Sequence, residues 1–512
     1  MTGPATTAVQ GVDLLAIAPP MLLAAAALVV LLVEAFRPAA RLVATTALAG
    51  AGLALAAELV LAADVLGGGR SRATFCLPAA LRGTGPASCS YVVDPFAVLL
   101  GLVALLAGAA ALLLAVPEIR RTRLPAGEFC FLLLTAVAGA VALPAGRDLV
   151  TLVVCLELVS LPVFALVALR RYDGRSTESA LTMFLVSVAS TAVMLYGISL
   201  VYGLAGSMYL DRIAVALNPA AAPPAAAVGI VLVLVGFGFK VSAVPFHTWA
   251  PDTYAGAPVA VAAVLAVVSK VAGFAGLVLV LVLGFGGFAP VWAPLVAVLA
   301  AASMTVGNLV ALRQRGALRL LAWSSIAQAG YVLAPLGALA GMAGRPELRE
   351  ELVAASVGYL VIYALMTTGA FAVVAFIGRI TPGNDGTDLD GYRGLARTHP
   401  VVGVAFAFFL ACLAGLPPGL AGLFAKVVVV RAVVDGGHGW LAVIVAVNTV
   451  IGLYYYLAWA VRLFAPPAAD GAAFGALRRP IAVAIAVAVA GLVLLSVFPE
   501  PVLAGWSLTG TG

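Results

Sequence analysis

The chain consists largely of apolar runs that are each long enough to cross a lipid bilayer. A membrane span needs about 20 mostly apolar residues, and runs of this kind recur through all 512 residues. Apolar residues make up 64% of the chain and charged residues only 10%, which would leave a water-soluble domain too little polar surface. The sequence therefore predicts an all-α polytopic membrane protein. We expect about fourteen transmembrane helices, at residues 14–33, 44–66, 91–116, 129–143, 149–169, 180–204, 225–245, 259–284, 291–312, 318–340, 352–380, 401–434, 440–464 and 481–498.

The arginines between these runs predict the orientation of the chain in the membrane. Of the 28 basic residues three are lysines, and the connections on one side collect 17 arginines while those on the other side have 8. Cytoplasmic connections carry the excess of basic residues, so we expect both termini on the outer side. Cys76 and Cys89 would then share an outer loop, where the sequence is equally compatible with a disulfide and with two free thiols.

Motifs for cofactors and metals are missing from the sequence. The five cysteines form no CxxC pair and no cluster with histidine, and the glycine-rich stretch VLGGGR lacks the lysine of a phosphate-binding loop. The net charge of +6 is spread over short arginine clusters rather than over one face, which argues against nucleic-acid binding. We therefore expect this chain to bind no metal, cofactor or nucleic acid.

Four ionisable residues lie deep inside predicted spans, where each costs roughly 2.5–3.5 kcal/mol to insert. They are Glu157 and the only three lysines of the chain, Lys240, Lys270 and Lys426. Structural salt bridges or snorkelling side chains would be a simpler interpretation, but one carboxylate cannot neutralise three ammonium groups. A guanidinium stays charged in proteins, whereas an ammonium group out of water can release its proton. The use of lysine only within the membrane therefore favours a role in proton handling.

Prolines beside these charges predict interruptions in two of the spans. Pro245 follows Lys240 by five residues, and the pair Pro417–Pro418 precedes Lys426. Because proline removes a helical hydrogen bond, we expect broken helices at the seventh and twelfth spans. The two lysines lie five spans apart, which suggests two inverted five-helix repeats. The expected segments are 1–127 with three helices, 128–285 and 286–464 with one repeat each, and 465–512 with a final helix.

Several weaker candidates remain open. Glu34 and Asp94 lie at span ends and are expected to anchor the chain at the membrane surface, whereas Glu58 is ambiguous. His247 is as compatible with feeding protons into the relay as with packing at the interface. The run Tyr454–Tyr456 is expected to serve packing rather than a hydrogen-bonded relay.

Several motifs together resemble the antiporter-like membrane subunits of respiratory complex I. The resemblance is carried by FKVSAVPFHTWAPDTYAGAPVAVAAVLAVVSKVAGF, LELVSLPVFALVAL, NLVALRQRGALRLLAWSSIAQAGY and LAGLPPGLAGLFAKVVVV, and it covers at least residues 128–460. Within this family, a lysine at Lys426 favours the N or L type of subunit. A chain that stops after fourteen spans, without a long lateral helix, resembles the N type.

The resemblance implies a proton-translocating subunit of a bacterial NADH–quinone oxidoreductase in the cell membrane, driven by quinone reduction elsewhere in the complex. Glu157 would be the partner of Lys240. Lys270 would be the central relay, and Lys426 would discharge protons to the outside. FMN and iron–sulfur clusters would lie in partner subunits, and sister antiporter-like subunits would be neighbours. A subunit of a multisubunit cation/proton antiporter is the alternative.

Two positions depart from the family pattern. Thr182 stands where a lysine is common, and Gln328 stands where a histidine is common. Neither side chain titrates, although both can orient water through hydrogen bonds. We therefore expect the relay between Lys270 and Lys426 to depend more on water.

Overall fold

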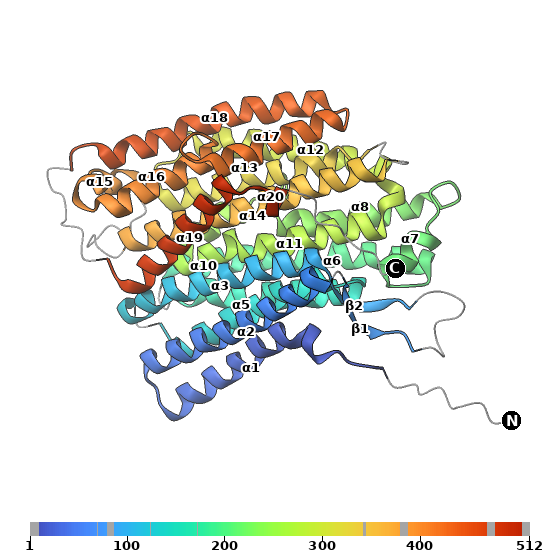
Figure 1. The fold of residues 1–512 in the computed structure, drawn as a ribbon, viewed down its shortest axis with the longest axis horizontal. Helices are drawn as coiled ribbons and strands as arrows, with labels where there is room; N and C mark the ends of the chain where they lie inside the picture. Colours follow the sequence, from blue (N-terminus) through green and yellow to red (C-terminus); the bar gives the residue numbers. More distant parts are fainter. Residues whose placement is uncertain are drawn as a thin grey trace.

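The computed structural model shows a bundle of long helices that run roughly parallel to one another (Figure 1). It describes residues 10–68, 70–78, 87–122, 124–170, 173–340, 345–378, 388–467 and 477–503. Within these ranges, 11 helices are long and apolar enough to cross a membrane. The prediction of a polytopic helical membrane protein is therefore confirmed. The two termini, which are predicted to lie on the outer side, are outside the described ranges.

Every predicted span overlaps at least one helix. The first three correspond to α1 (Leu14–Phe36), α2 (Ala40–Gly68) and α3 (Pro95–Thr122). The next group comprises α4 (Ala126–Ala142), α5 (Leu149–Ala168), α6 (Gly174–Ala205), α8 (Pro224–Lys240), α10 (Val259–Ala266) and α11 (Val268–Leu279). The last group comprises α12 (Ala289–Ala311), α13 (Ala317–Gly337), α14 (Pro346–Ile377), α16 (Pro400–Ala414), α17 (Leu420–Asp435), α18 (Gly439–Phe464) and α19 (Arg479–Val497). The short helices are α7 (Leu210–Ala216), α9 (Ala250–Gly256), α15 (Leu395–Thr398) and α20 (Glu500–Leu503).

Two helices are broken where the sequence predicts a break. The first break follows α8, and the irregular residues 241–249 lead from it into α9. The second break separates α16 from α17 at residues 415–419. A third irregularity lies at Val267, between α10 and α11. The sequence does not predict it, because residues 259–272 contain no proline or glycine. The count of fourteen crossings stays a prediction, since α8, α13 and the α16–α17 pair are not among the 11 long apolar helices.

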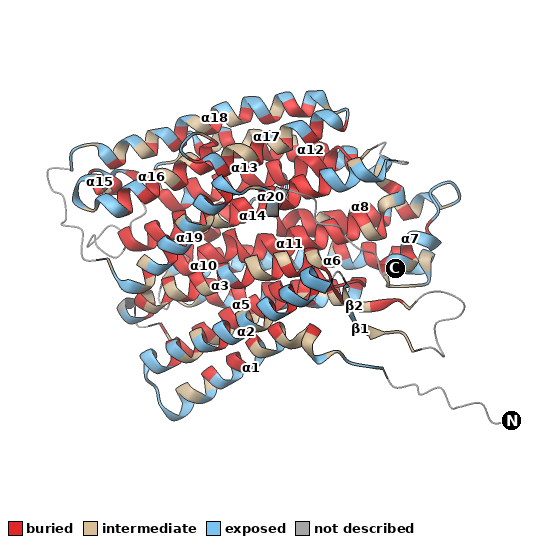
Figure 2. Cartoon of the chain, in the orientation of Figure 1, coloured by how far each residue is buried: buried red, intermediate tan, exposed pale blue. Residues whose placement is uncertain are grey.

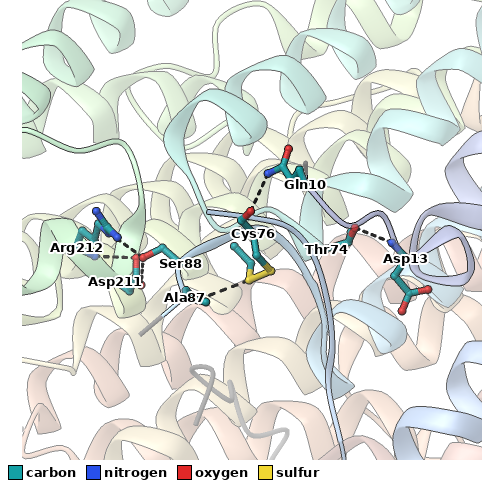
Figure 3. The surroundings of a disulfide bond; sticks show 9 residues. Gln10, Asp13, Thr74, Cys76, Ala87, Ser88, Asp211 and Arg212 are labelled. Atoms are coloured by element: carbon teal, nitrogen blue, oxygen red, sulfur yellow. Dashed lines mark hydrogen bonds between the residues drawn. A yellow bond between two sulfur atoms is a disulfide. The ribbon is translucent and has the colours of Figure 1, made fainter. Parts of the chain in front are cut away.

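A β hairpin connects α2 to α3 at one end of the bundle (Figure 1). Its strands, β1 (Arg72–Cys76) and β2 (Cys89–Val93), pair in antiparallel register. A disulfide joins Cys76 to Cys89 (Figure 3), which decides between the two possibilities that the sequence leaves open. The hairpin is therefore closed covalently at the end away from the helices.

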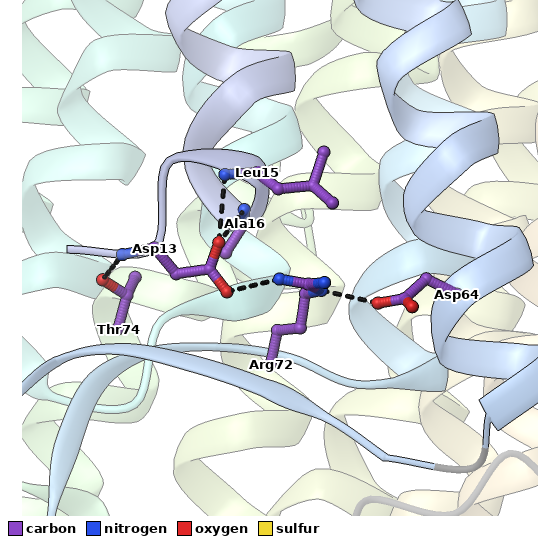
Figure 4. A network of polar contacts seen from close by, with 6 residues as sticks. All are labelled: Asp13, Leu15, Ala16, Asp64, Arg72 and Thr74. Carbon is purple, nitrogen blue, oxygen red and sulfur yellow. Dashed lines mark hydrogen bonds and ion pairs between the residues drawn. The ribbon is translucent and has the colours of Figure 1, made fainter.

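The hairpin also holds the beginning of α1 (Figure 4). Arg72 donates hydrogen bonds to Asp13 (2.7 Å) and to Asp64 (2.5 Å), so one guanidinium joins the start of α1 to the end of α2. Asp13 caps α1 by accepting a hydrogen bond from the backbone N–H of Leu15 (3.0 Å). Its own backbone N–H donates to Thr74 of β1 (2.9 Å). These contacts fix the N-terminal helices to the hairpin.

Two sequence predictions near the hairpin are wrong. The third span is predicted to begin at residue 91, but Tyr91 pairs with Thr74 in the sheet and α3 begins only at Pro95. Asp94 is predicted to anchor the chain at the membrane surface, but it is fully buried and forms an ion pair with Arg147 (2.6 Å). Both residues lie in or beside an apolar run, which suggested a membrane span. Their partners in the fold, Thr74 and Arg147, determine their structure instead.

Burial separates the centre of the bundle from its two edges (Figure 2). The central helices α10 and α11 are buried along their whole length, and α14 is buried along most of its length from Leu352 on. By contrast, α1 and α2 at one edge and α18 at the opposite edge keep exposed apolar faces. In a membrane such faces meet lipid or helices of another chain. The three lysines are buried, so they lie where lipid does not reach.

Candidate functional site

Lys240 is the last residue of α8 and is 3% exposed. Its Nζ donates a hydrogen bond to Ser160 Oγ in α5 (2.7 Å), and that hydroxyl donates to the carbonyl of Leu156 (2.7 Å). The stem of Lys240 packs against Gly273 of α11, where a β-carbon would lie 2.9 Å from Lys240 Cγ. The carbonyl end of a helix favours a cation, so the position of Lys240 suits an ammonium group without excluding the amine.

Glu157 is the predicted partner of Lys240, but the structure, which describes both side chains, shows no ion pair between them. The carboxylate of Glu157 instead accepts a hydrogen bond from Thr191 Oγ1 of α6 (2.9 Å). Glu157 and Ser160 are three residues apart on α5 and therefore lie on one face of it. From there the carboxylate still attracts Lys240 electrostatically. Ser160, which the sequence analysis missed, is the direct contact; its only signal is a hydroxyl one turn after the acid.

Lys270 lies in the first turn of α11 and is 1% exposed. Its Nζ donates to the backbone carbonyl of Ser325 in α13 (2.6 Å). The hydroxyl of Tyr363 in α14 lies 2.9 Å from both Ser325 Oγ and the carbonyl of Ala266, the last residue of α10. Tyr254 of α9 shares a longer hydrogen bond (3.4 Å) with Ser325 Oγ. Lys270 therefore sits beside hydroxyl groups at an irregular point of its own span.

Lys426 lies on α17 and is 5% exposed. Its Nζ donates to the carbonyls of Leu413 (3.1 Å) and Ala414 (2.9 Å), which are the last two of α16. Terminal carbonyls have no partner within their helix, so the break itself creates the acceptors that hold this lysine. The ring of Tyr331 in α13 lies under the ammonium group, 5.1 Å from Nζ to the ring centroid, in a cation–π contact.

Gln328 of α13 is the centre of a buried hydrogen-bond network. Its Oε1 accepts from the hydroxyl of Tyr359 in α14 (2.5 Å), which fixes the orientation of the amide. Its Nε2 donates to the hydroxyl of Tyr456 in α18 (3.2 Å) and, at 3.4 Å, to the carbonyl of Leu413. Tyr456 also shares a short hydrogen bond with Ser324. Gln328 is therefore held by side chains and a carbonyl of three other helices, and the expected role of water between Lys270 and Lys426 stays a prediction.

One turn of α13 connects the two lysines of the second half. The carbonyl of Ser325 binds Lys270. Three residues later, the amide of Gln328 donates to the carbonyl of Leu413, which also accepts from Lys426. A shift of this turn would therefore change the hydrogen bonding of both lysines at once.

The tyrosine run on α18 has three different environments. Tyr454 is exposed, Tyr455 donates to Asn308 Oδ1 in α12 (2.9 Å), and Tyr456 contacts Gln328. The sequence predicts packing alone for this run, whereas Tyr455 and Tyr456 also form buried hydrogen bonds. Helical spacing gives each of the three consecutive residues a different direction, but the sequence does not show which one points at Gln328.

The remaining predicted site residues lie apart from the lysines. Thr182 lines a cavity of about 530 Å³ at the start of α6, α9 and α13, together with charged residues that include Glu178 and the ion pair of Asp252 with Arg319. None of the buried lysines lines this cavity. His247 is half-buried and packs its ring against Trp323, with 5.3 Å between ring centroids. Within the part of the chain that the structure describes, no three His, Cys, Asp or Glu side chains are grouped so that they could hold a metal ion.

Comparisons with known proteins agree with this architecture. The sequence model of the NADH:quinone oxidoreductase/Mrp antiporter transmembrane family matches residues 146–452. The chain is 49% identical over 487 residues to NADH-quinone oxidoreductase subunit N 2 of Streptomyces griseus, covering 93% of this chain and 87% of that protein. It is 47% identical over 453 residues to subunit N of Salinispora tropica, covering 88% and 84% of the two chains.

Solved structures show the same fold. A chain of respiratory complex I from Thermus thermophilus with bound aureothin matches with a TM-score of 0.74 and 32% identity, covering 96% of this chain and all of that one (100%). A chain of the Mrp complex from Dietzia sp. DQ12-45-1b matches with a TM-score of 0.81 and 22% identity, covering 96% of each chain. The second likeness, at this identity, concerns the fold alone.

Proposed function

The chain belongs to the subunit N family of NADH-quinone oxidoreductases, the antiporter-like membrane subunits of respiratory complex I, and from this premise we propose that its buried glutamate and three lysines form a proton relay. The relay would run from Glu157 and Lys240 through Lys270 to Lys426, and it would be driven by quinone reduction elsewhere in the complex. Redox cofactors would lie in partner subunits, and sister antiporter-like subunits would flank this one. The orientation with both termini outside belongs to the same proposal.

The arrangement around α13 is the observation that carries this proposal. Lys270 and Lys426 are each held by a backbone carbonyl, and Gln328 donates to the carbonyl that holds Lys426. An ammonium group donates up to three hydrogen bonds, whereas a neutral amine is a weaker donor and also accepts one. When Lys426 releases its proton, the carbonyl of Leu413 becomes a better acceptor for Gln328. A residue that cannot titrate would thus transmit the charge state of one lysine towards the other.

The first half of the relay would work through charge rather than direct contact. Glu157 lies one turn before Ser160 on α5, and its negative charge attracts Lys240 while Ser160 holds the ammonium group. A hydroxyl both donates and accepts, so Ser160 can bind the ammonium form and the amine form of Lys240. Moving the charge of Glu157 would then bias the proton on Lys240 without breaking its hydrogen bond.

The experiment that tests the proposal neutralises one lysine at a time in the assembled complex. Lys240→Met and Lys426→Met are expected to leave the complex assembled and to abolish most NADH-driven proton pumping. Arg431→Met is a matched control for Lys426→Met, because Arg431 lies on the same helix α17 but is exposed and pairs with Asp435 at 3.4 Å. Normal pumping by both lysine variants would refute the relay.

The alternative function is a cation/proton antiporter subunit driven by an ion gradient. The likeness to the Mrp complex is compatible with it, but at 22% identity it concerns the fold alone. Sodium transport by membranes that contain the complex, in the absence of NADH, would favour this alternative. Transport that requires NADH favours the relay of a redox-driven complex.

A further inference from the structure

A second buried carboxylate, Glu58, lies outside the row of lysines. It is 4% exposed and occupies the face of α2 that packs against α3. It lies ten positions before the end of α2 at Gly68, which is about 15 Å along the helix from the hairpin end. Gly101 of α3 faces it so closely that a β-carbon there would overlap Glu58 Oε1. The absence of a side chain at Gly101 is what makes room for the carboxyl group.

Among the residues that the structure describes, no cation is paired with Glu58. None of the ion pairs among the described residues includes it. The buried Arg147 nearby in the fold is already paired with Asp94 at 2.6 Å. On the same helix, Asp64 is paired with Arg72 at the surface. A carboxylate buried in the membrane without a cation is costly as an anion, and this arrangement suits a group that binds a proton.

Tyr91 connects Glu58 with the rest of the bundle. This residue of β2 is buried and packs in one apolar cluster with Leu61 and Val65, which follow Glu58 on the same face of α2. Its phenol lies near Glu58 of α2, Cys155 of α5 and Arg147, and among the described residues no hydrogen bond joins it directly to Glu58. Asp94, the partner of Arg147, and Asp148, which acts on Cys155, are further charged groups near the site. Cys155 lies two residues before Glu157, so Tyr91 lies near both Glu58 and the helix that carries the first acid of the relay.

We propose that Glu58 is a proton-binding site of the N-terminal helices and that it exchanges its proton through the hydroxyl of Tyr91 with water at the hairpin end. In the loading step, a water molecule between the two side chains gives a proton to a carboxylate oxygen of Glu58 and takes the proton of the Tyr91 hydroxyl, whose O–H bond breaks. The phenol oxygen takes a proton from a hydronium ion at the hairpin end, which is left as water, so Tyr91 ends as it began and Glu58 carries one proton more. The binding of the proton does not depend on the lysine relay; only its use in pumping rests on the function proposed above.

Infrared spectroscopy of the purified complex tests the binding site directly. The carbonyl stretch of a protonated carboxyl group is expected in the wild type and is expected to be lost in Glu58→Gln, which keeps the shape of the side chain. Asp64→Asn is the matched control on the same helix and is expected to keep the band. Identical spectra of wild type and Glu58→Gln in this region, over the range of pH in which the complex is stable, would overturn the proposal.

Hydrogen–deuterium exchange of the same band tests the route. Tyr91→Phe retains the ring in its apolar cluster and removes the hydroxyl, so the band is expected to persist while its shift in deuterated water becomes slower. An unchanged exchange rate would overturn the part played by Tyr91. Proton yield per NADH is expected to be lower in Glu58→Gln than in Asp64→Asn, and equal yields would exclude Glu58 from pumping. Because the infrared signal does not require pumping, failure of the lysine relay would leave the test of Glu58 intact.

Discussion

The two broken helices hold their lysines in different ways. Lys240 lies before its break, as the last residue of α8, and binds a side-chain hydroxyl of a neighbouring helix, Ser160. Lys426 lies after its break, on α17, and binds two backbone carbonyls of α16, those of Leu413 and Ala414. The first site is thus built from a partner that a mutation can remove. The second is built from the break itself.

This difference concerns the side-chain partners and leaves the prediction of two inverted repeats open. Equivalent repeats would lead us to expect equivalent lysines, but a hydroxyl serves both the ammonium and the amine form, whereas a carbonyl only accepts. Lys426 therefore meets acceptors in either state, and Lys240 meets a partner that can reverse its role. The repeats and the segments 1–127, 128–285, 286–464 and 465–512 stay predictions.

The largest expected effect concerns stability, and it sharpens the comparison because the hairpin braces only the first half. Ser90 of β2 accepts a hydrogen bond from the backbone N–H of Arg147 (2.8 Å), two residues before α5 begins. Removing the disulfide with Cys76→Ser and Cys89→Ser is expected to lower stability by about 3 kcal/mol, seen as a lower Tm of the complex. A reductant should lower the Tm of the wild type and not that of the double variant. Equal Tm values for the two proteins would contradict the brace.

The next effect would distinguish the two lysine sites. Ser160→Ala leaves Lys240 without its hydroxyl partner and is expected to cost about 1.5–3 kcal/mol in the pumping step, or about a tenfold to hundredfold loss of rate. Ser160→Thr should restore much of the rate. The control is Ser199→Ala in α6, where an exposed hydroxyl bonds only to the carbonyl of Leu195. If Ser160→Ala pumps like the wild type, Lys240 does not depend on this hydroxyl.

The smallest effect concerns the network next to Lys426. Tyr456→Phe removes the hydroxyl that accepts a hydrogen bond from Gln328. We expect it to raise the activation free energy of NADH-driven pumping by about 0.5–1.5 kcal/mol and so to lower the pumping rate. Tyr454→Phe, at an exposed position of the same helix, is expected to change nothing. In the double variant Tyr456→Phe with Gln328→His, pumping should be faster than in Tyr456→Phe alone, because histidine can take up and release a proton. Equal rates in Tyr456→Phe and Tyr454→Phe would contradict a role for this network.

The sequence predicts the breaks that depend on local chemistry and misses those that depend on tertiary contacts. Pro245 and the pair Pro417–Pro418 predict the breaks beside Lys240 and Lys426, because proline lacks the N–H that forms a backbone hydrogen bond inside a helix. The irregularity at Val267 has no such signal. At this point the hydroxyl of Tyr363, on another helix, donates a hydrogen bond to the carbonyl of Ala266. The sequence does not show this tertiary contact.

The same distinction applies to the candidate site. The buried charges are readable from the sequence, since an ionisable group within an apolar run is costly wherever that run packs. Their partners are not readable, because Ser160, Ser325 and Leu413 lie on other helices and their spacing along the chain carries no information about contact. The sequence predicts Glu157 as the direct partner of Lys240, whereas the structure shows Ser160 in that place. The buried charged residues can thus be identified from the sequence although their contacts cannot.

Proton pumping by the assembled complex with Lys270→Arg tests the central claim most directly. The relay requires an amine that loses its proton for part of the cycle, and a guanidinium does not lose its proton in proteins. Arginine can still donate to the carbonyl of Ser325 and keeps the positive charge that a structural role would need. We predict an assembled complex that no longer pumps protons when it oxidises NADH. An assembled complex that pumps at the wild-type rate would contradict the account.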